Sequence, residues 1–137
     1  MRVFVDTSAW YAVADSGDRS NQQAKEVLSA TATFVTSDHV LLETWLLLRH
    51  RVSRNSAERF WHGLRRGAAQ IEVVLAEDLE NAWAIGLQFP DQDFSLADRT
   101  SFALMQRLQI HRVASFDDDF AVFRYGRDRN LAFEVLR

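Results

Sequence analysis

The sequence predicts an α/β fold: a single domain with a central, mostly parallel five-stranded sheet and helices on both of its faces. Two observations predict this fold. Short runs of β-branched and aromatic residues alternate with longer helical stretches along the whole chain, and such alternation implies crossovers onto a parallel sheet. No repeat, linker or low-complexity segment divides the 137 residues, which suit one domain of ordinary size. We therefore expect one domain over residues 1–137.

Strands are predicted where short apolar runs are bounded by polar or turn-forming residues. The first is the run RVFV at the start of the chain, the second is TFVT, and the remaining three follow in the second half. In chain order, the predicted strands cover residues 2–5, 33–36, 71–75, 111–114 and 131–136.

Helices are predicted between these strands from their capping residues and their ends. The patterns Ser20/Gln23 and Ser95/Asp98 are typical of capping boxes, and Ser37 with the residue after it caps a long apolar helix. Gly67 closes one helix and Pro90, the only proline, stops another. In chain order, the predicted helices cover residues 7–14, 20–30, 39–51, 56–66, 77–89 and 96–108.

The composition excludes several classes of protein. Hydrophobic residues make up 47% of the chain and charged residues 26%, as in ordinary globular proteins. Cysteine is absent, which excludes disulfides, zinc–thiolate sites and thiol catalysis. No signal-peptide pattern and no apolar run long enough for a bilayer is present. We expect a cytoplasmic protein with no membrane partner.

Four acidic residues are predicted to meet at one edge of the sheet. Asp6 follows the first strand, Asp117 follows the fourth, and Asp98 lies in the first turn of a helix after a loop that returns to the same edge. Glu43 lies within VLLETWLLL, a helix so apolar that we expect its side chain to be mostly buried. In open α/β sheets, functional groups gather outside the carboxyl ends of the strands.

Each acid also has a purely structural explanation. Asp6 could be a helix N-cap, and Asp98 is the third helical residue (N3) of a capping-box pattern. Asp117 and its two following aspartates could begin a short helix, and a buried arginine could neutralise Glu43. The coincidence of all four at one edge favours a site over four separate structural roles.

Such a cluster of carboxylates requires protons or a cation. Two carboxylates about 4 Å apart repel by about 4 kcal/mol at an effective dielectric constant of about 20. Oxygen ligands without Cys, and without His at ligand spacing, favour Mg²⁺ or Mn²⁺ over zinc. The chemistry that fits is metal-assisted hydrolysis of a phosphodiester.

The distribution of charge suits a nucleic-acid partner despite a net charge of −3. Lys25 is the only lysine, and arginines concentrate between the first and second thirds of the chain. Arginine binds phosphate with two parallel hydrogen bonds, although a solvated helix face would have the same composition. The candidate RNA-binding residues are Arg49, Arg51, Arg54, Arg65 and Arg66.

Four motifs in this order resemble the PIN-domain ribonucleases, specifically the VapC-type toxins of bacterial type II toxin–antitoxin systems. They are FVDTSAW, the glutamate of HVLLETW, the SLAD helix and the closing SFDDDF, and together they extend over essentially the whole chain. The resemblance implies a PIN-like fold and an Mg²⁺- or Mn²⁺-dependent endoribonuclease. The implied metal-binding and catalytic residues are Asp6, Glu43, Asp98 and Asp117, with Asp119 as an extra acid of undefined role. The supporting hydroxyls are Thr7 or Ser8, and Ser115.

The resemblance also implies partners. It implies a structured RNA substrate, either the sarcin–ricin loop of large-subunit rRNA or a tRNA anticodon loop. It also implies inhibition by a VapB-type antitoxin and assembly into a homodimer. The stretches around Glu43 and Asp98 are more similar to the rRNA-cleaving branch. The alternative is a non-catalytic PIN-like module that binds RNA or protein. Retention of all four acids favours the enzyme.

Overall fold

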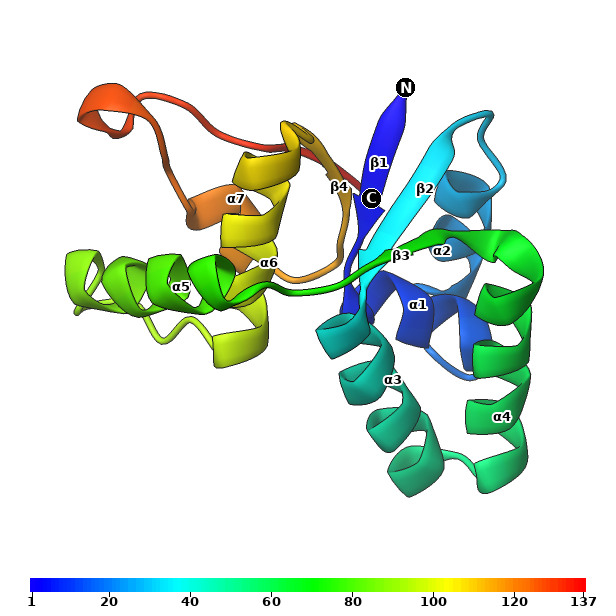
Figure 1. The fold of residues 1–137 in the computed structure, drawn as a ribbon. Helices are drawn as coiled ribbons and strands as arrows, with labels where there is room; N and C mark the ends of the chain where they lie inside the picture. The colour runs from blue at the N-terminus through cyan, green and yellow to red at the C-terminus, as the bar shows by residue number, and fades with distance from the viewer.

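The computed structural model describes all residues, 1–137, as a five-stranded sheet in the order β3-β2-β1-β4-β5. Every neighbouring pair of strands is parallel, which confirms the predicted fold class. The strands are β1 (Arg2–Val5), β2 (Thr33–Ser37), β3 (Gln70–Glu72), β4 (Arg112–Ala114) and β5 (Glu134–Leu136). Helices α1 to α4 gather on one side of the sheet and α5 to α7 on the other (Figure 1).

The helices connect the strands as the alternation predicted. They are α1 (Thr7–Ala14), α2 (Asn21–Leu28), α3 (Asp38–Arg51), α4 (Arg54–Gly63), α5 (Ala76–Gln88), α6 (Leu96–Leu108) and the single turn α7 (Asp119–Val122). A π-helical turn, Leu64–Ala68, follows α4, and a short 3-10 turn, Arg127–Arg129, precedes β5. None of these helices combines the length and apolar composition that crossing a bilayer requires.

The connections of the sheet change direction between β1 and β4: β2 and β3 lie on one side of β1, and β4 and β5 lie on the other. The chain winds outward from β1 through β2 to β3 and then crosses back to β4, on the other side of β1. In a doubly wound sheet, this reversal opens a crevice at the carboxyl ends of the two strands. The residues that follow β1 and β4, Asp6 and Ser115, therefore lie at the place where such folds bind ligands.

The centre of the molecule is apolar on both sides of β1. Val3, Phe4 and Val5 are fully buried, because helices cover both faces of a parallel sheet. On the side of α6, the rings of Phe102 and Phe123 stack with their centres 4.2 Å apart. This packing fixes the position of α6, whose first turn carries Asp98.

Several predicted boundaries are wrong, each for a local reason. Ser20 precedes α2 but its side chain caps no amide, so the predicted capping box does not form. The fourth helix begins before residue 56, because Ser53 accepts a hydrogen bond from the Ser56 N–H and caps Arg54–Gly63. It ends in the π turn, where Gly67 has φ of 99°, a left-handed conformation that glycine adopts readily.

Two strands are shorter than predicted because their partners end. The pairing of β3 with β2 ends where Ser37 lies opposite Glu72, because the residue after Ser37 is already the first residue of α3. The last predicted strand loses its first part because Leu131 pairs with Tyr125 in an isolated antiparallel bridge.

Candidate metal-binding active site

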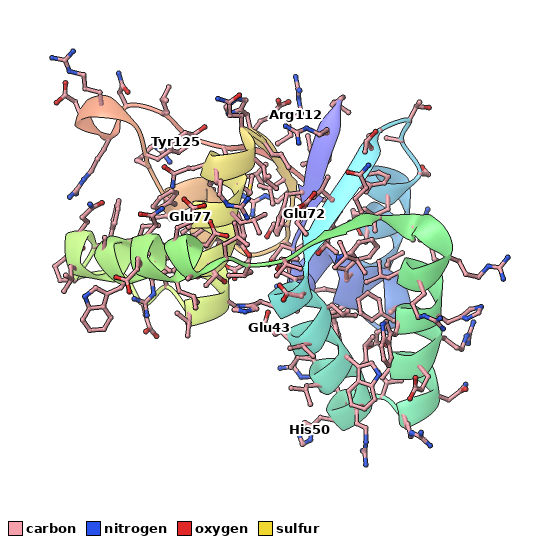
Figure 2. The ribbon with its side chains drawn as sticks, in the orientation of Figure 1. Glu43, His50, Glu72, Glu77, Arg112 and Tyr125 are labelled. Atoms are coloured by element: carbon pink, nitrogen blue, oxygen red, sulfur yellow. The ribbon has the colours of Figure 1, made fainter.

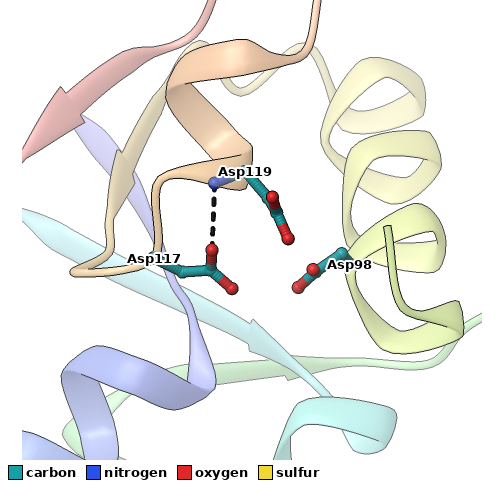
Figure 3. A group of neighbouring side chains, drawn as sticks. All are labelled: Asp98, Asp117 and Asp119. Carbon is teal, nitrogen blue, oxygen red and sulfur yellow. Dashed lines mark hydrogen bonds between the residues drawn. The ribbon is translucent and has the colours of Figure 1, made fainter. Parts of the chain in front are cut away.

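Three aspartates from two separated segments converge at the carboxyl edge of the sheet. Asp98, Asp117 and Asp119 each offer a carboxylate oxygen, and these oxygens all lie within 4.8 Å of one another. Figure 3 shows Asp98 reaching from α6 toward the other two side chains, which lie on the segment after β4. We call these three residues the acid cluster. Asp119, whose role the sequence left undefined, belongs to it.

Hydrogen bonds fix the shape of this segment. The Asp119 N–H donates to Asp117 Oδ1 at 2.9 Å, which turns the chain into α7 (Figure 3). The Asp117 N–H donates to the Ser115 hydroxyl at 3.0 Å. Asp117 therefore has a partial capping role, while the carboxylates of Asp117 and Asp119 remain directed toward Asp98.

Asp6 lies beside the acid cluster and is held by two serines. Its Oδ2 accepts hydrogen bonds from the hydroxyls of Ser8 (2.9 Å) and Ser115 (3.0 Å) and from the Ser8 N–H (3.3 Å). The Ser8 hydroxyl also accepts from the Phe116 N–H at 2.9 Å, which ties the end of β1 to the end of β4. Asp6 is thus both the N-cap of α1 and a buried acid at the site.

Thr7 behaves differently from the two serines. It is buried and its Oγ1 has no hydrogen-bond partner, although it lines the same cavity as the acids. A buried polar atom without a partner is costly unless a ligand or water satisfies it. Of the three predicted supporting hydroxyls, Ser8 and Ser115 orient Asp6, and the Thr7 hydroxyl is buried without a hydrogen-bond partner.

The electrostatics of these acids show that they require a cation or protons. Burial raises the pKa of Asp98 to about 8, with further increases from the hydrogen bond to Asp119 and from the charges of Asp6, Asp117 and Asp119. Burial also raises the pKa of Asp6 to about 6, against the lowering effect of its serine hydrogen bonds. The pKa of Asp117 is raised by burial and by neighbouring carboxylates.

No basic side chain neutralises these acids. The four ion pairs of the protein join other residues, and none includes Asp6 or a member of the acid cluster. Carboxylate oxygens at this spacing, with no nitrogen or sulfur ligand, fit a hard divalent cation. The donor set therefore fits a divalent cation, and the choice between particular metals stays a prediction.

Glu43 lines the same cavity from α3 but stands apart from the acid cluster. Its side chain is largely but not fully buried, in agreement with the expectation from the sequence. The buried face of α3 is Val40, Thr44 and Leu48, and Glu43 lies beside that face, on the side toward α6 (Figure 2). Glu43 is therefore placed to contact a ligand in the cavity across from the aspartates.

The cavity has a volume of about 470 Å³ and a partly cationic wall. Arg51 lines it, with its guanidinium carbon 5.5 Å from the centre of the Tyr11 ring, and Arg19 lines it from the turn before α2. The Tyr11 hydroxyl donates to Asp15 at 2.7 Å, which fixes the ring under Arg51. Sequence analysis missed Tyr11 and Arg19; the spacing of one helical turn between Thr7 and Tyr11 was the available signal for the tyrosine.

The other predicted RNA-binding arginines do not line this cavity. Arg49 and Arg54 lie near Arg51, where α3 ends and α4 begins, and Arg54 forms an exposed ion pair with Glu58 at 3.6 Å. Arg65 and Arg66 lie in the π turn at the other end of α4 (Figure 1). The five arginines therefore form two separate groups on the surface.

The fold and the acid cluster together define a doubly wound α/β protein with a cluster of carboxylates at its switch point. Comparison with known proteins agrees, since residues 3–124 match the PIN-domain family. The chain is 35% identical over 120 residues to the 23S rRNA-specific endonuclease VapC20 of Mycobacterium tuberculosis, covering 87% of this chain and 92% of that protein. It is 25% identical over 116 residues to ribonuclease VapC26 of the same organism, covering 84% of this chain and 86% of that protein. The chain belongs to the PIN-domain family and resembles its VapC members over most of its length.

Solved structures agree with this assignment. The crystal structure of M. tuberculosis VapC20, described as a sarcin–ricin loop cleaving toxin, superposes with a TM-score of 0.82 at 34% identity and covers 88% of this chain and 93% of that one. The crystal structure of VapBC2 from Rickettsia felis, bound to a DNA fragment from its promoter, gives a TM-score of 0.64 at 12% identity and covers 100% of both chains. The second similarity shows the fold alone. The sequence-based assignment to the PIN family is confirmed.

Proposed function

We propose that this protein is a divalent-metal-dependent endoribonuclease that hydrolyses phosphodiester bonds in structured RNA. The observation that carries the proposal is the convergence of three carboxylates within 4.8 Å with no basic partner, at the base of a cavity. The similarity to VapC20, a 23S rRNA-specific endonuclease, makes the sarcin–ricin loop of large-subunit rRNA the first substrate to test and tRNA anticodon loops the second. The reaction would take place in the cytoplasm, within one domain over residues 1–137.

The proposed metal is Mg²⁺ or Mn²⁺. Asp98, Asp117 and Asp119 would hold it, with Asp6 beside them and Glu43 across the cavity. When bound, such an ion supplies a more acidic water molecule and stabilises negative charge on the phosphate. Asp6, Glu43, Asp98 and Asp117 are the proposed catalytic residues.

The protein's own residues orient these groups and manage their protons. The hydroxyls of Ser8 and Ser115 hold Asp6 Oδ2 in one position. The raised pKa values of Asp6 and Asp98 mean that cation binding must displace protons from both carboxyls. Arg51 and Arg19, which line the same cavity, would contact RNA phosphates next to the one that is cleaved.

Partners complete the proposal. Large apolar side chains are exposed along α5, at Leu79, Trp83 and Leu87, and on α3, at Leu42 and Leu46. Such surfaces are typical of protein contacts. They support the proposed homodimer and a VapB-type antitoxin that covers the toxin.

The experiment that tests the proposal is cleavage of total bacterial RNA with Mg²⁺, with Mn²⁺ or with EDTA, followed by mapping of the new RNA ends. Wild type should give discrete ends that disappear with EDTA and in Asp98→Asn. Asp91→Asn is the matched control, because Asp91 is exposed in the preceding loop and does not line the cavity. Folded wild type that cuts no RNA and gains no thermal stability from either ion would favour the non-catalytic binding module.

A further inference from the structure

A second hollow lies on the other side of α6 from the active-site cavity. It has a volume of about 530 Å³ and shares no lining residue with that cavity. Its walls come from α5, from the second half of α6 and from the segment after α7, and Figure 2 labels Glu77 and Tyr125 at its borders. Three arginines line it, Arg107, Arg124 and Arg129, and we call it the arginine hollow.

Two of these guanidinium groups are held in place by neutral partners. Arg124 Nη1 donates to the carbonyl oxygens of Ala121 at 2.6 Å and of Phe123 at 2.9 Å. Arg129 Nη2 donates to the Gln88 carbonyl at 3.2 Å, and its guanidinium lies 4.7 Å from the centre of the Phe89 ring. Neither arginine forms an ion pair, so both keep their full positive charge.

Each of these two arginines also keeps donors for a ligand. A guanidinium has five N–H groups, and Arg124 and Arg129 each use only one nitrogen within the protein. Because their positions are already fixed, less side-chain entropy is lost when they bind an anion. Both are exposed side chains, and their contacts within the protein favour one position of each guanidinium group.

The remaining lining limits what the hollow can bind. Arg107 is neutralised by Asp78, with two contacts of 2.9 Å, and Glu77 is the one acid that lines the hollow directly. Two unpaired cations against one carboxylate leave the hollow positive in a chain whose net charge is −3. Asn81, Gln88, Gln106 and Tyr125 also line the hollow, together with apolar residues.

The Tyr125 ring is rigid, because it stacks on Phe133 with the ring centres 4.7 Å apart. Amides and a fixed aromatic ring next to two guanidinium groups are the groups that contact the base, sugar and phosphate of a nucleotide.

We propose that the arginine hollow binds a phosphate group of the RNA substrate, on nucleotides outside the cleavage site. This inference rests on the proposed ribonuclease function. Helix α6 joins the two sites: Asp98 lines the active-site cavity and Gln106 lines the hollow. Eight residues of helix separate them by about 12 Å along the axis, a length that a short stretch of RNA can span.

The test measures RNA affinity without cleavage. Wild type and variants are titrated with a fluorescently labelled rRNA fragment in EDTA, at a series of KCl concentrations. Arg129→Ala should weaken binding and reduce the slope of log affinity against log salt by about 1, the signature of one lost phosphate contact. Arg124→Gln should do the same. Arg127→Ala is the matched control, because Arg127 is exposed in the same turn but does not line the hollow.

Each outcome decides one proposal. If Arg129→Ala and Arg124→Gln both match Arg127→Ala in affinity and slope, the hollow does not contact RNA and this inference fails, while wild-type cleavage still stands. If wild type cuts no RNA but the slope falls as expected, the ribonuclease proposal fails and the phosphate site remains.

A separate titration with adenosine monophosphate and with inorganic phosphate distinguishes the source of the phosphate. Binding of either ligand that is lost in Arg129→Ala, with an unchanged RNA slope, would assign the hollow to a free nucleotide or phosphate and overturn its assignment to RNA.

Discussion

Asp78 and Asp98 occupy the same position in two helices that pack together, yet their surroundings give them opposite properties. Each is the third residue of its helix, in α5 and α6, and each is buried. Asp78 forms two contacts of 2.9 Å with Arg107 and accepts the Leu75 N–H at 2.9 Å. Burial alone would raise its pKa, but these partners outweigh burial and hold the pKa below its usual value.

Asp98 has no such partners. Burial and three neighbouring carboxylates raise its pKa to about 8. In α5 the acid of the capping pattern reaches back to the amide before the helix, whereas in α6 only the Ser95 hydroxyl caps, at 3.0 Å from the Asp98 N–H. The Asp98 carboxylate is thereby free to face the carboxylates of Asp117 and Asp119. Position and burial therefore do not separate a structural acid from a functional one; the charge of the partner does.

Asp98→Asn should produce the largest effect and sharpen this contrast. Loss of a residue that only orients a metal ligand already costs about 10- to 100-fold in activity or metal affinity, so loss of a ligand itself should reduce cleavage by more than about 100-fold. The same change removes a carboxyl that is ionised in the unfolded chain but must be protonated, or repelled by its neighbours, in the folded metal-free protein, so the free energy of unfolding in EDTA should rise. Cleavage rates and urea unfolding of wild type, Asp98→Asn and Asp91→Asn measure both effects. A variant that is less stable and also inactive would mean that Asp98 has a structural role.

Asp78→Asn should give the opposite result. It leaves Arg107 without its counter-charge, and breaking a buried pair of this kind costs about 3 kcal/mol of unfolding free energy. Urea unfolding measures the loss, and cleavage per folded molecule should remain close to wild type. The double variant Asp78→Leu/Arg107→Leu should recover stability, because it removes both charges. No recovery would mean that the two residues act separately.

Much of this contrast could not be predicted from the sequence. The alternation of strands and helices predicted the fold, and the bounds of α6 were predicted correctly. The capping-box pattern at Ser95 and Asp98 allowed two readings, because sequence does not show whether the acid turns back to its own helix or outward. No local pattern in the sequence marks Asp78, since its partner Arg107 lies on another helix.

Glu43 and Asp119 illustrate the same limit. The helix around Glu43 is apolar on nearly all sides, so its sequence does not specify the buried face, and Leu42 and Leu46 are exposed at 62% and 61%. Asp119 joins the acid cluster only because the Asp119 N–H bonds to Asp117 and turns the chain there. Both outcomes depend on packing between distant segments, which no local pattern encodes.

The metal-free protein should lose stability as pH rises, which is the next largest effect. Asp6 and Asp98 have folded-state pKa values of about 6 and about 8, above the ordinary value of 3.8. Between pH 3.8 and the folded-state pKa of each group, the folded protein therefore binds more protons than the unfolded chain, and the free energy of unfolding falls as pH increases. The stability that protonation of these two carboxyls contributes is fully present below about pH 4. It is lost as the pH rises through about 6 for Asp6 and through about 8 for Asp98. Urea unfolding in EDTA measures it, and Asp98→Asn should abolish the part between pH 6 and 8.

Mg²⁺ should stabilise the protein more at pH 8 than at pH 6, because the ion competes with the protons on Asp6 and Asp98. At a Mg²⁺ concentration 100 times its dissociation constant, the gain should be about 2.7 kcal/mol. Thermal unfolding at both pH values measures the difference, with Asp98→Asn as the variant that should gain little. Equal stabilisation of wild type and variant would place the ion elsewhere.

Ser95→Ala should give the smallest effect and tests whether capping and chemistry are separate in α6. The Ser95 hydroxyl satisfies the Asp98 N–H, and loss of such a cap costs about 1 kcal/mol of unfolding free energy. The hydroxyl makes no hydrogen bond to the Asp98 carboxylate, so the fall of metal-free stability with pH should keep the wild-type slope. Urea unfolding of Ser95→Ala across pH 4 to 8 measures both quantities. A flatter dependence of unfolding free energy on pH, as expected for Asp98→Asn, would show that the cap also affects the protonation of the acid cluster. The contrast between Asp78 and Asp98 would then depend on the residue before each helix rather than on the acid itself.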